Sequence, residues 1–350
     1  MRLRTRFRRG VPEHSIAPHG GAPSTLLLAL LLLAGILDGP TAAAAAGCKL
    51  EKVAELPVTM SGLRPMVHAM INGNDALFIA DSGAFYSLLT PAAAAEFKLR
   101  LRPAPYWFAV RGIGGEAAQT WLTVVKTFTI FNLPIPNVDF TVAGNDFGGS
   151  AAGLLGQNVL RLAGDVEYDL ANGVIRLIRT DGCGDAPLAY WATSQPYSVI
   201  DIDRATATMP HTTGAASVNG ARIRVMFDTG ASTSVLTVEA AKRAGVTPGS
   251  QGVVPAGPAF GVGRQLAQTW IAPFASFKIG DEEIRNTHLR IGAGVREADM
   301  LIGADFFLSH HVYVANSQRK LYFTYNGGPV FNLTTTPGAA ANSAVPGSAT

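Results

Sequence analysis

The sequence predicts an all-β protein built from two tandem copies of one domain. Three observations carry this prediction. Short segments such as 128–133 and 277–279 are rich in β-branched and aromatic residues and end in turn residues. Asn-Gly dipeptides, which favour tight hairpin turns, separate such segments. Several motifs recur at one constant, domain-sized spacing, which indicates a duplicated domain and not a solenoid.

The clearest repeated motif is a tetrad that follows an apolar run. Asp81-Ser82-Gly83-Ala84 follows residues 76–80, and Asp228-Thr229-Gly230-Ala231 follows residues 225–227. Each copy places one carboxylate on a glycine turn at the end of a buried strand. A single tetrad is equally typical of a simple turn at a strand end. Two copies predict that two carboxylates lie together.

Other motifs repeat in the same order around the tetrads. Thr90 and Thr237 each precede a helical pattern, at 91–97 and 238–244, and threonine is a good N-cap. The spacing of 147 residues between the two aspartates also separates further pairs: Asn72-Gly73 from Asn219-Gly220, and Leu154-Leu155-Gly156 from Leu301-Ile302-Gly303. Between them lie two glycine-rich segments, Gly112-Ile113-Gly114-Gly115 and Gly261-Val262-Gly263.

These motifs, in this order and twice in one chain, resemble the retropepsin-like aspartic proteases. The resemblance covers residues 55–180 and 197–325. It implies two β-barrel lobes with one short helix each, in a pseudo-two-fold arrangement. It implies an endopeptidase without metal or cofactor, in which Asp81 and Asp228 share one proton and activate a water. The chain departs from the two-lobed pepsin pattern in lacking an obvious flap tyrosine, and its lobes are longer than a minimal retropepsin.

The resemblance also implies roles for the residues around the two aspartates. The side chains of Ser82 and Thr229 would link the loops, and Gly83 and Gly230 would let them approach. The glycine-rich segments would be flaps that close over a peptide or protein substrate: Gly112, Ile113, Gly114 and Gly115 in the first copy, and Gly261, Val262 and Gly263 in the second.

Two other classes of function remain open at this level. A catalytically silent module on the same fold would bind extended peptides as an added strand without cutting them. A structural envelope protein with a duplicated β-domain would not need paired carboxylates. Retention of both aspartates and both glycines favours the endopeptidase.

Residues 1–46 are predicted to be an export signal. Five arginines lie within the first nine positions, an apolar stretch follows at 26–37, and small residues follow at 42–46. This predicts a periplasmic or secreted protein, with an uncleaved membrane anchor as the open alternative. The leader takes five of the 28 basic and two of the 25 acidic residues, which leaves 23 of each. Because the remainder is neutral, we expect no nucleic-acid partner.

The two cysteines, Cys48 and Cys183, flank the first repeat. Export into an oxidising compartment favours a disulfide between them. Two alternatives remain open: lipidation at Cys48, and two free thiols.

The repeats predict the domain boundaries. We expect one lobe at 47–185 and the other at 186–328, with a Gly- and Pro-rich linker at 181–196. Residues 329–350 lack periodicity and are predicted to be a disordered tail. A linker of this length lets the second lobe fold back on the first, which predicts a monomer, with a lobe-swapped dimer as the alternative.

Two further groups of polar residues are interpreted as structural. His310 and His311 are neighbours on a predicted strand and point to opposite faces, so no metal site is expected there. Asp165, Glu167 and Asp169 alternate on another strand. A cation site is one interpretation of this pattern, but the pattern favours the solvated face of an antiparallel sheet.

Overall fold

The structure is a computed structural model of the 350-residue chain. It describes residues 47–331 and 333, apart from 145, 149, 207, 208, 260, 264 and 295. The described residues all belong to one compact unit. The predicted leader at 1–46, and residues 332 and 334–350 of the predicted tail, lie outside the described residues. Within the described part of the chain, no helix has the length and apolar character needed to cross a bilayer.

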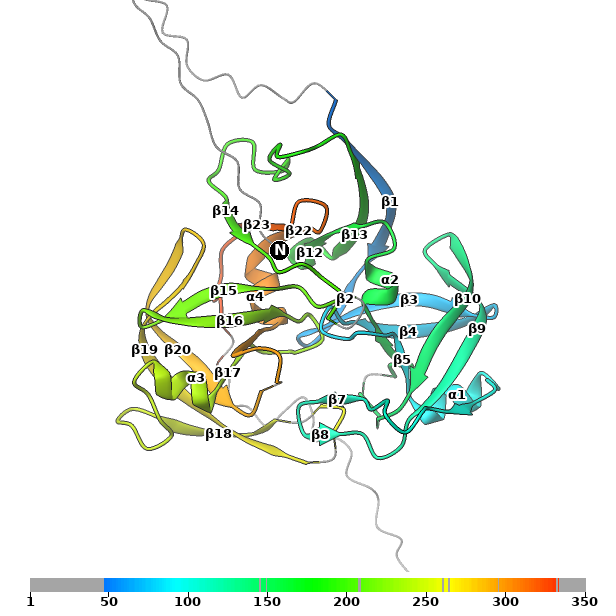
Figure 1. Ribbon diagram of the computed structural model, residues 1–350, viewed down its shortest axis with the longest axis horizontal. Helices are drawn as coiled ribbons and strands as arrows, with labels where there is room; N and C mark the ends of the chain where they lie inside the picture. The colour runs from blue at the N-terminus through cyan, green and yellow to red at the C-terminus, as the bar shows by residue number, and fades with distance from the viewer. Residues whose placement is uncertain are drawn as a thin grey trace, which may run out of the picture. The chain divides into compact units, whose positions relative to one another are not determined.

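The first lobe is an eight-stranded sheet with two short helices (Figure 1). Its strands run in the order β2-β3-β4-β11-β5-β10-β9-β6, and a small hairpin, β7–β8, stands apart. The elements are β2 (Thr59–Ser61), β3 (Arg64–Ile71), β4 (Asn74–Ala80), β5 (Leu88–Leu89), α1 (Pro91–Glu96), β6 (Arg102–Pro103), β7 (Arg111–Gly112), β8 (Gly115–Glu116), β9 (Trp121–Ile130), β10 (Leu133–Val142), β11 (Gly153–Leu155) and α2 (Gln157–Leu160).

The second lobe repeats this arrangement in a seven-stranded sheet of order β15-β16-β21-β17-β20-β19-β18. The elements are β15 (Thr213–Val218), β16 (Ala221–Phe227), β17 (Val235–Thr237), α3 (Val238–Arg243), β18 (Val254–Ala259), β19 (Ala267–Ile279), β20 (Glu282–Gly292), β21 (Met300–Ile302) and α4 (Ala304–Ser309). The all-β class and the tandem duplication are therefore confirmed. Each lobe has a second short helix, α2 or α4, beyond the one that was predicted.

The local signals in the sequence account for these elements. Asn72 and Asn219 have φ values of 50° and 48°, and each joins two antiparallel strands. The hydroxyl oxygens of Thr90 and Thr237 each accept a backbone N–H bond, from Ala93 and Ala240, at 3.1 Å. These bonds cap α1 and α3 as the sequence predicts.

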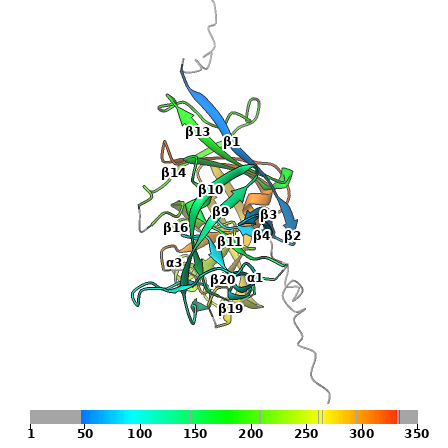
Figure 2. The ribbon, with the colours of Figure 1, turned by 90° about the vertical axis from the view of Figure 1, so that its right-hand side faces the viewer.

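A third sheet of six strands joins the lobes, in the order β1-β13-β12-β22-β23-β14. The junction between the lobes is the antiparallel pair β12–β22. β1 and β13 run side by side along their length (Figures 1 and 2). The elements are β1 (Lys49–Pro57), β12 (Asp165–Asp169), the 3₁₀ helix η1 (Leu170–Asn172), β13 (Val174–Asp181), β14 (Ser198–Asp201), β22 (His310–Ala315) and β23 (Lys320–Tyr325).

The acidic residues of β12 do not lie on a solvated face. Asp165, Glu167 and Asp169 are buried, with exposed fractions of 1%, 0% and 5%. The prediction of a wet face was wrong because the shared sheet is covered on both sides. Neighbouring polar groups satisfy the carboxylates: Ser317 donates to Asp165 through its backbone N–H and its hydroxyl, and Arg176 and Tyr190 donate to Glu167.

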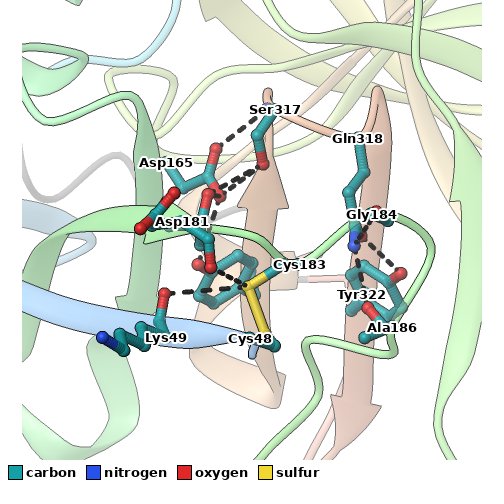
Figure 3. Close-up of a disulfide and its surroundings, with 12 residues drawn as sticks. Cys48, Lys49, Asp165, Asp181, Cys183, Gly184, Ala186, Ser317, Gln318 and Tyr322 are labelled. Atoms are coloured by element: carbon teal, nitrogen blue, oxygen red, sulfur yellow. Dashed lines mark hydrogen bonds between the residues drawn. A yellow bond between two sulfur atoms is a disulfide. The ribbon is translucent and has the colours of Figure 1, made fainter. Parts of the chain in front are cut away.

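The predicted linker at 181–196 packs against the shared sheet. Leu188 and Ala189 are buried in an apolar cluster with Tyr313 and Tyr322. From the second lobe, the side-chain amide of Gln318 donates to the backbone carbonyls at 184 and 186, both at 2.8 Å (Figure 3). The linker is thus a packed segment that holds the two lobes together, and it does not act as a free tether.

Cys48 and Cys183 form a disulfide at the end of the shared sheet (Figure 3). Cys48 directly precedes β1, and Cys183 follows β13, so the bond closes the open end of this strand pair. Cys183 also belongs to the apolar cluster under the linker. The disulfide therefore fastens the first strand of the unit to the segment that leads into the second lobe.

We expect the Cys48→Ala/Cys183→Ala double variant to be less stable by about 2–4 kcal/mol, because the unfolded chain loses a cross-link over 135 residues. The difference in free energy of unfolding is measured by urea denaturation of both proteins. Thiol titration of the denatured, unreduced wild-type protein is the control, and two free thiols there would contradict the bond.

Candidate active site

The two aspartates follow equivalent strands. Asp81 follows β4 and Asp228 follows β16, and each strand is paired in parallel with a strand from the far end of its lobe, β11 or β21. The backbone N–H of Asp81 donates to the carbonyl of Leu155 at 2.9 Å, and that of Asp228 to Ile302 at 2.8 Å. The parallel neighbour therefore fixes where each strand ends and where the aspartate loop begins.

Each tetrad glycine faces the aspartate of the other lobe. A Cβ atom on Gly83 would overlap the carboxylate of Asp228, and one on Gly230 would overlap that of Asp81. Only glycine permits this approach of backbone to side chain. The two carboxylates lie within hydrogen-bonding reach of each other. The structure thus brings together the two residues that the duplicated tetrads single out.

Ser82 and Thr229 lock the two loops by reciprocal hydrogen bonds. The Ser82 N–H donates to Thr229 Oγ1 at 3.0 Å, and the Thr229 N–H donates to Ser82 Oγ at 2.9 Å. Each hydroxyl then donates across to the strand before the opposite aspartate, Ser82 to Phe227 at 2.8 Å and Thr229 to Ala80 at 2.7 Å. All four polar groups are buried and satisfied, so the loops are held in one geometry.

The electrostatic surroundings favour one proton on the pair. Burial raises the pKa of Asp81 well above its ordinary value, and the neighbouring Asp228 charge raises it further. Burial also raises the pKa of Asp228, although hydrogen bonds from Asp81 and from the backbone of Ala231 and Gly230 oppose this shift. The N–H groups of Gly230 and Ala231 donate to one Asp228 oxygen at 2.9 and 3.1 Å. Asp81 receives the equivalent bond from the Gly83 N–H at 2.9 Å, so these surroundings place one proton on the pair as a whole.

The two glycine-rich segments meet over the site. In the first, Arg111 pairs with Glu116 and Gly112 with Gly115 in the β7–β8 hairpin. Backbone bonds join the two segments, from Gly263 N–H to the Ile113 carbonyl at 3.3 Å and from position 265 to position 114 at 3.0 Å. A Cβ atom on Gly261 or Gly263 would overlap the backbone at 113 or 114.

Each of these segments places an apolar residue on the opposite lobe. Ile113 packs against Met226 and Leu301 of the second lobe, together with Ala231 beside Asp228. Val262 packs in a cluster of the first lobe that contains Leu88, Ala117 and Ala143. The segments predicted as flaps therefore lie in contact with each other and with both lobes.

His211 also belongs to this site, although the sequence analysis did not identify it. Burial lowers the pKa of His211, while the charges of Asp228 and Glu297 and a hydrogen bond with the Gly83 backbone act in the other direction. Its Nδ1 atom is buried and, within the described residues, has no hydrogen-bond partner. His211 lies 147 residues after Arg64, which is also the spacing of the two aspartates. The repeat therefore pairs His211 with a basic residue of the first lobe, and this pairing is the signal that the sequence contained.

The paired histidines lie elsewhere, in the shared sheet. His310 contacts Glu282 at 3.0 Å and stacks on Phe306, while His311 contacts Glu167 at 2.7 Å. Among the residues that the structure describes, no cluster of three His, Cys, Asp or Glu side chains is arranged to hold a metal ion.

Comparison with known families matches both halves of the chain. Residues 67–159 match the family described as Aspartyl protease, and residues 215–309 match the family described as gag-polyprotein putative aspartyl protease. No curated protein matches. The two matched segments contain the two tetrads and both glycine-rich segments.

Three solved structures are similar to this chain at low sequence identity. A retropepsin-like aspartic protease from Rickettsia conorii is 16% identical with a TM-score of 0.28, covering 39% of this chain and 96% of its own. Basic 7S globulin from soybean is 11% identical with a TM-score of 0.44, covering 81% and 98%. The EIAV protease in complex with the inhibitor HBY-793 is 26% identical with a TM-score of 0.24, covering 28% and 86%.

Proposed function

Since this chain belongs to the retropepsin-like aspartyl proteases, with one such domain in each half, we propose that it is an exported endopeptidase. A water molecule activated by Asp81 and Asp228 would hydrolyse the peptide bond. The observation that carries the proposal is the buried pair of carboxylates, locked by Ser82 and Thr229 and covered by the two glycine-rich segments.

The proposed reaction uses the two carboxylates in different protonation states. The ionised partner of the Asp81–Asp228 pair takes a proton from the attacking water. The protonated partner donates its proton to the oxygen of the scissile carbonyl. Backbone donors, Gly83 for Asp81 and Gly230 and Ala231 for Asp228, stabilise the carboxylate that carries the charge. Because the two groups titrate together, the pH profile reports on the pair.

The flaps would exclude bulk water and add backbone hydrogen bonds to an extended substrate. Their contacts with each other must open for a peptide to enter. The glycines at 112–115 and 261–263 suit this movement, because Gly114 and Gly115 already have φ values of 84° and 92°. We therefore assign these segments as the flaps of the proposed enzyme.

Incubation of residues 47–350 with a mixed peptide library at pH 3–8 tests the proposal, with and without a transition-state-mimicking inhibitor of aspartic proteases. We expect cleavage that the inhibitor abolishes. The predicted alternative, a silent peptide-binding module, would instead retain peptides without new termini. Binding of library peptides without cleavage at any pH would overturn the proposed activity.

We expect the intact protein to be active as a monomer, because one chain carries both aspartates and the linker packs against the sheet that joins the lobes. Sedimentation velocity combined with activity measurements on each fraction checks this. Activity that appears only in a dimeric fraction, and is lost on dilution, would show that the carboxylates come from different chains. Lobes 47–185 and 186–328, produced separately, should be inactive.

We expect His211→Gln to move the acidic limb of the kcat/KM profile to higher pH by a few tenths to about one unit. A protonated His211 places a positive charge near Asp228, and this charge favours the ionised form of the aspartate pair. Above its lowered pKa the ring is neutral, so rates near neutral pH should change little. His288→Gln, at an exposed position in β20, is the control. An acidic limb at the same pH in both variants would contradict a role for His211.

A further inference from the structure

The segment between α1 and the first flap exposes an unusual set of side chains. Three are cationic and three are large and apolar or amphipathic: Lys98, Arg100, Arg102, Leu101, Tyr106 and Trp107. The exposed fractions are 41% for Leu101, 101% for Tyr106 and 70% for Trp107. No acidic residue occurs from 97 to 115. We call residues 98–107 the basic–aromatic segment.

The cations of this segment have no ion-pair partner among the described residues. The salt bridge nearest in sequence, Arg111–Glu116, lies at the base of the flap hairpin. Beyond the predicted leader the chain is neutral, with 23 basic and 23 acidic residues. The positive charge of the segment is therefore a local feature and does not follow from an overall excess.

The backbone of the segment is held in place although its side chains are exposed. The Arg100 carbonyl accepts a bond from the Thr123 hydroxyl at 2.9 Å, and the Ala104 N–H donates to Thr120 at 3.1 Å. β6 pairs with β9. The Trp107 ring packs edge-on against Phe108, at 6.2 Å between centroids. The exposed side chains are therefore presented by an ordered backbone.

The second lobe provides an internal comparison. At the spacing of the two aspartates, residues 245–254 correspond to 98–107 and begin in the same way. Lys98 and Gly245 both have positive φ, and both donate to the carbonyl three residues earlier. Yet residues 245–258 contain no charged residue and no aromatic residue. The fold therefore forms this connection without the cations and rings, so their presence in the first lobe needs another explanation.

We propose that the basic–aromatic segment docks the protein on an anionic lipid surface. Lysine and arginine near a membrane gain from anionic headgroups, and tryptophan and tyrosine prefer the boundary between headgroups and acyl chains. A lipid surface can accommodate fully exposed side chains such as Tyr106, because the lipid molecules rearrange around them. This proposal does not depend on peptidase activity.

Docking would place the first flap near the lipid. β7 begins at Arg111, four residues after Trp107. If the protein is also the proposed endopeptidase, its nearest substrates would be polypeptide segments that emerge from the membrane. Cleavage in solution would remain independent of lipid.

Cosedimentation of residues 47–350 with vesicles tests the proposal. Vesicles of phosphatidylglycerol and phosphatidylethanolamine are compared with vesicles of phosphatidylcholine at low and at physiological salt. We expect binding only to the anionic vesicles, with weaker binding as salt rises. Of the four tryptophans, Trp107 alone is exposed to solvent. Its fluorescence should shift to the blue on binding, because the ring moves from water into a less polar surrounding.

Two variants identify the residues responsible. Arg100→Gln/Arg102→Gln should weaken binding at least tenfold, and Trp107→Ser should remove most of the fluorescence shift. Arg222→Gln/Lys278→Gln, which removes the same charge from exposed positions of the second lobe, should bind like the wild type. Equal loss in both double variants, equal binding to phosphatidylcholine, or no binding at low salt would each overturn the proposal. If no vesicles are bound even at low salt, the inference would instead be an acidic protein partner.

Discussion

Asp81→Asn and Asp228→Asn are each expected to abolish peptide cleavage, with a fall in kcat of at least about 10³-fold. One remaining carboxylate cannot both accept the proton of the water and donate a proton to the carbonyl. The asparagine keeps the size of the side chain, so the bonds between Ser82 and Thr229 should persist. Cleavage of a fluorogenic peptide selected from the library measures the effect.

Asp139→Asn is a suitable control, because this residue lies on β10 at an exposed position away from the pair. Circular dichroism and thermal unfolding should show that all three variants are folded. An aspartate variant with near-normal kcat would show that the two carboxylates do not act as a pair.

Glu167→Ala is expected to have the largest effect on stability, about 3–5 kcal/mol in the free energy of unfolding. The Glu167 carboxylate is fully buried and accepts bonds from Arg176 at 2.7 Å, from His311 at 2.7 Å and from Tyr190. Because Glu167 lies on β12 and His311 on β22, the change would leave polar groups without partners at the junction of the lobes. Urea unfolding followed by tryptophan fluorescence measures it, since Trp191 stacks on His311.

Glu51→Ala is the matched control for this measurement. Glu51 lies on β1 and pairs with Arg179 at 3.1 Å, but both side chains are largely exposed. We expect it to cost less than about 1 kcal/mol. A similar small loss for Glu167→Ala would show that the buried network does not hold the lobes together.

The Glu167→Gln variant removes the charge of Glu167 but keeps the size of its side chain, so it measures the contribution of the charge alone. Burial alone would raise the pKa of Glu167, but hydrogen bonds from His311 and Tyr190 and the charges of His311 and Arg176 outweigh it, and the pKa is lowered. Because the pKa of Glu167 is lower in the folded protein, its charge stabilises the fold at pH values above the pKa of the unfolded state, about 4.3. This contribution is lost as the pH falls through the pKa of the folded state. The stability difference between wild type and Glu167→Gln should therefore shrink below pH 4. A constant difference would contradict this assignment.

The sequence predicted the parts of the molecule that local chemistry specifies. An aspartate followed by a small hydroxyl residue and glycine marks a turn that only certain residues can make, and the duplication showed which two turns belong together. The same reasoning placed the Asn-Gly hairpins and the threonine caps. These features depend on neighbours within a few residues, so a single sequence is sufficient to predict them.

The features that were missed depend on contacts between distant segments. Glu167 has the alternating pattern of a half-solvated strand, and only the pairing of β12 with β22 and the packing of the linker bury it. His211 resembles an ordinary residue before a strand until the fold brings Gly83 and Asp228 beside it. A period of two residues identifies a strand, but it does not reveal what covers each face.

The correspondence between Arg64 and His211 has a consequence for how a substrate is read. A peptide has direction: its residues before the scissile bond differ from those after it. In a site made of two identical halves, the two opposite orientations of one bound peptide would be equivalent. Here, one half has an arginine that donates to the Phe147 carbonyl, and the other has a histidine beside Asp228. Unequal halves in one chain make these two orientations inequivalent, so under the proposed function a peptide would bind beside the aspartate pair in one preferred direction.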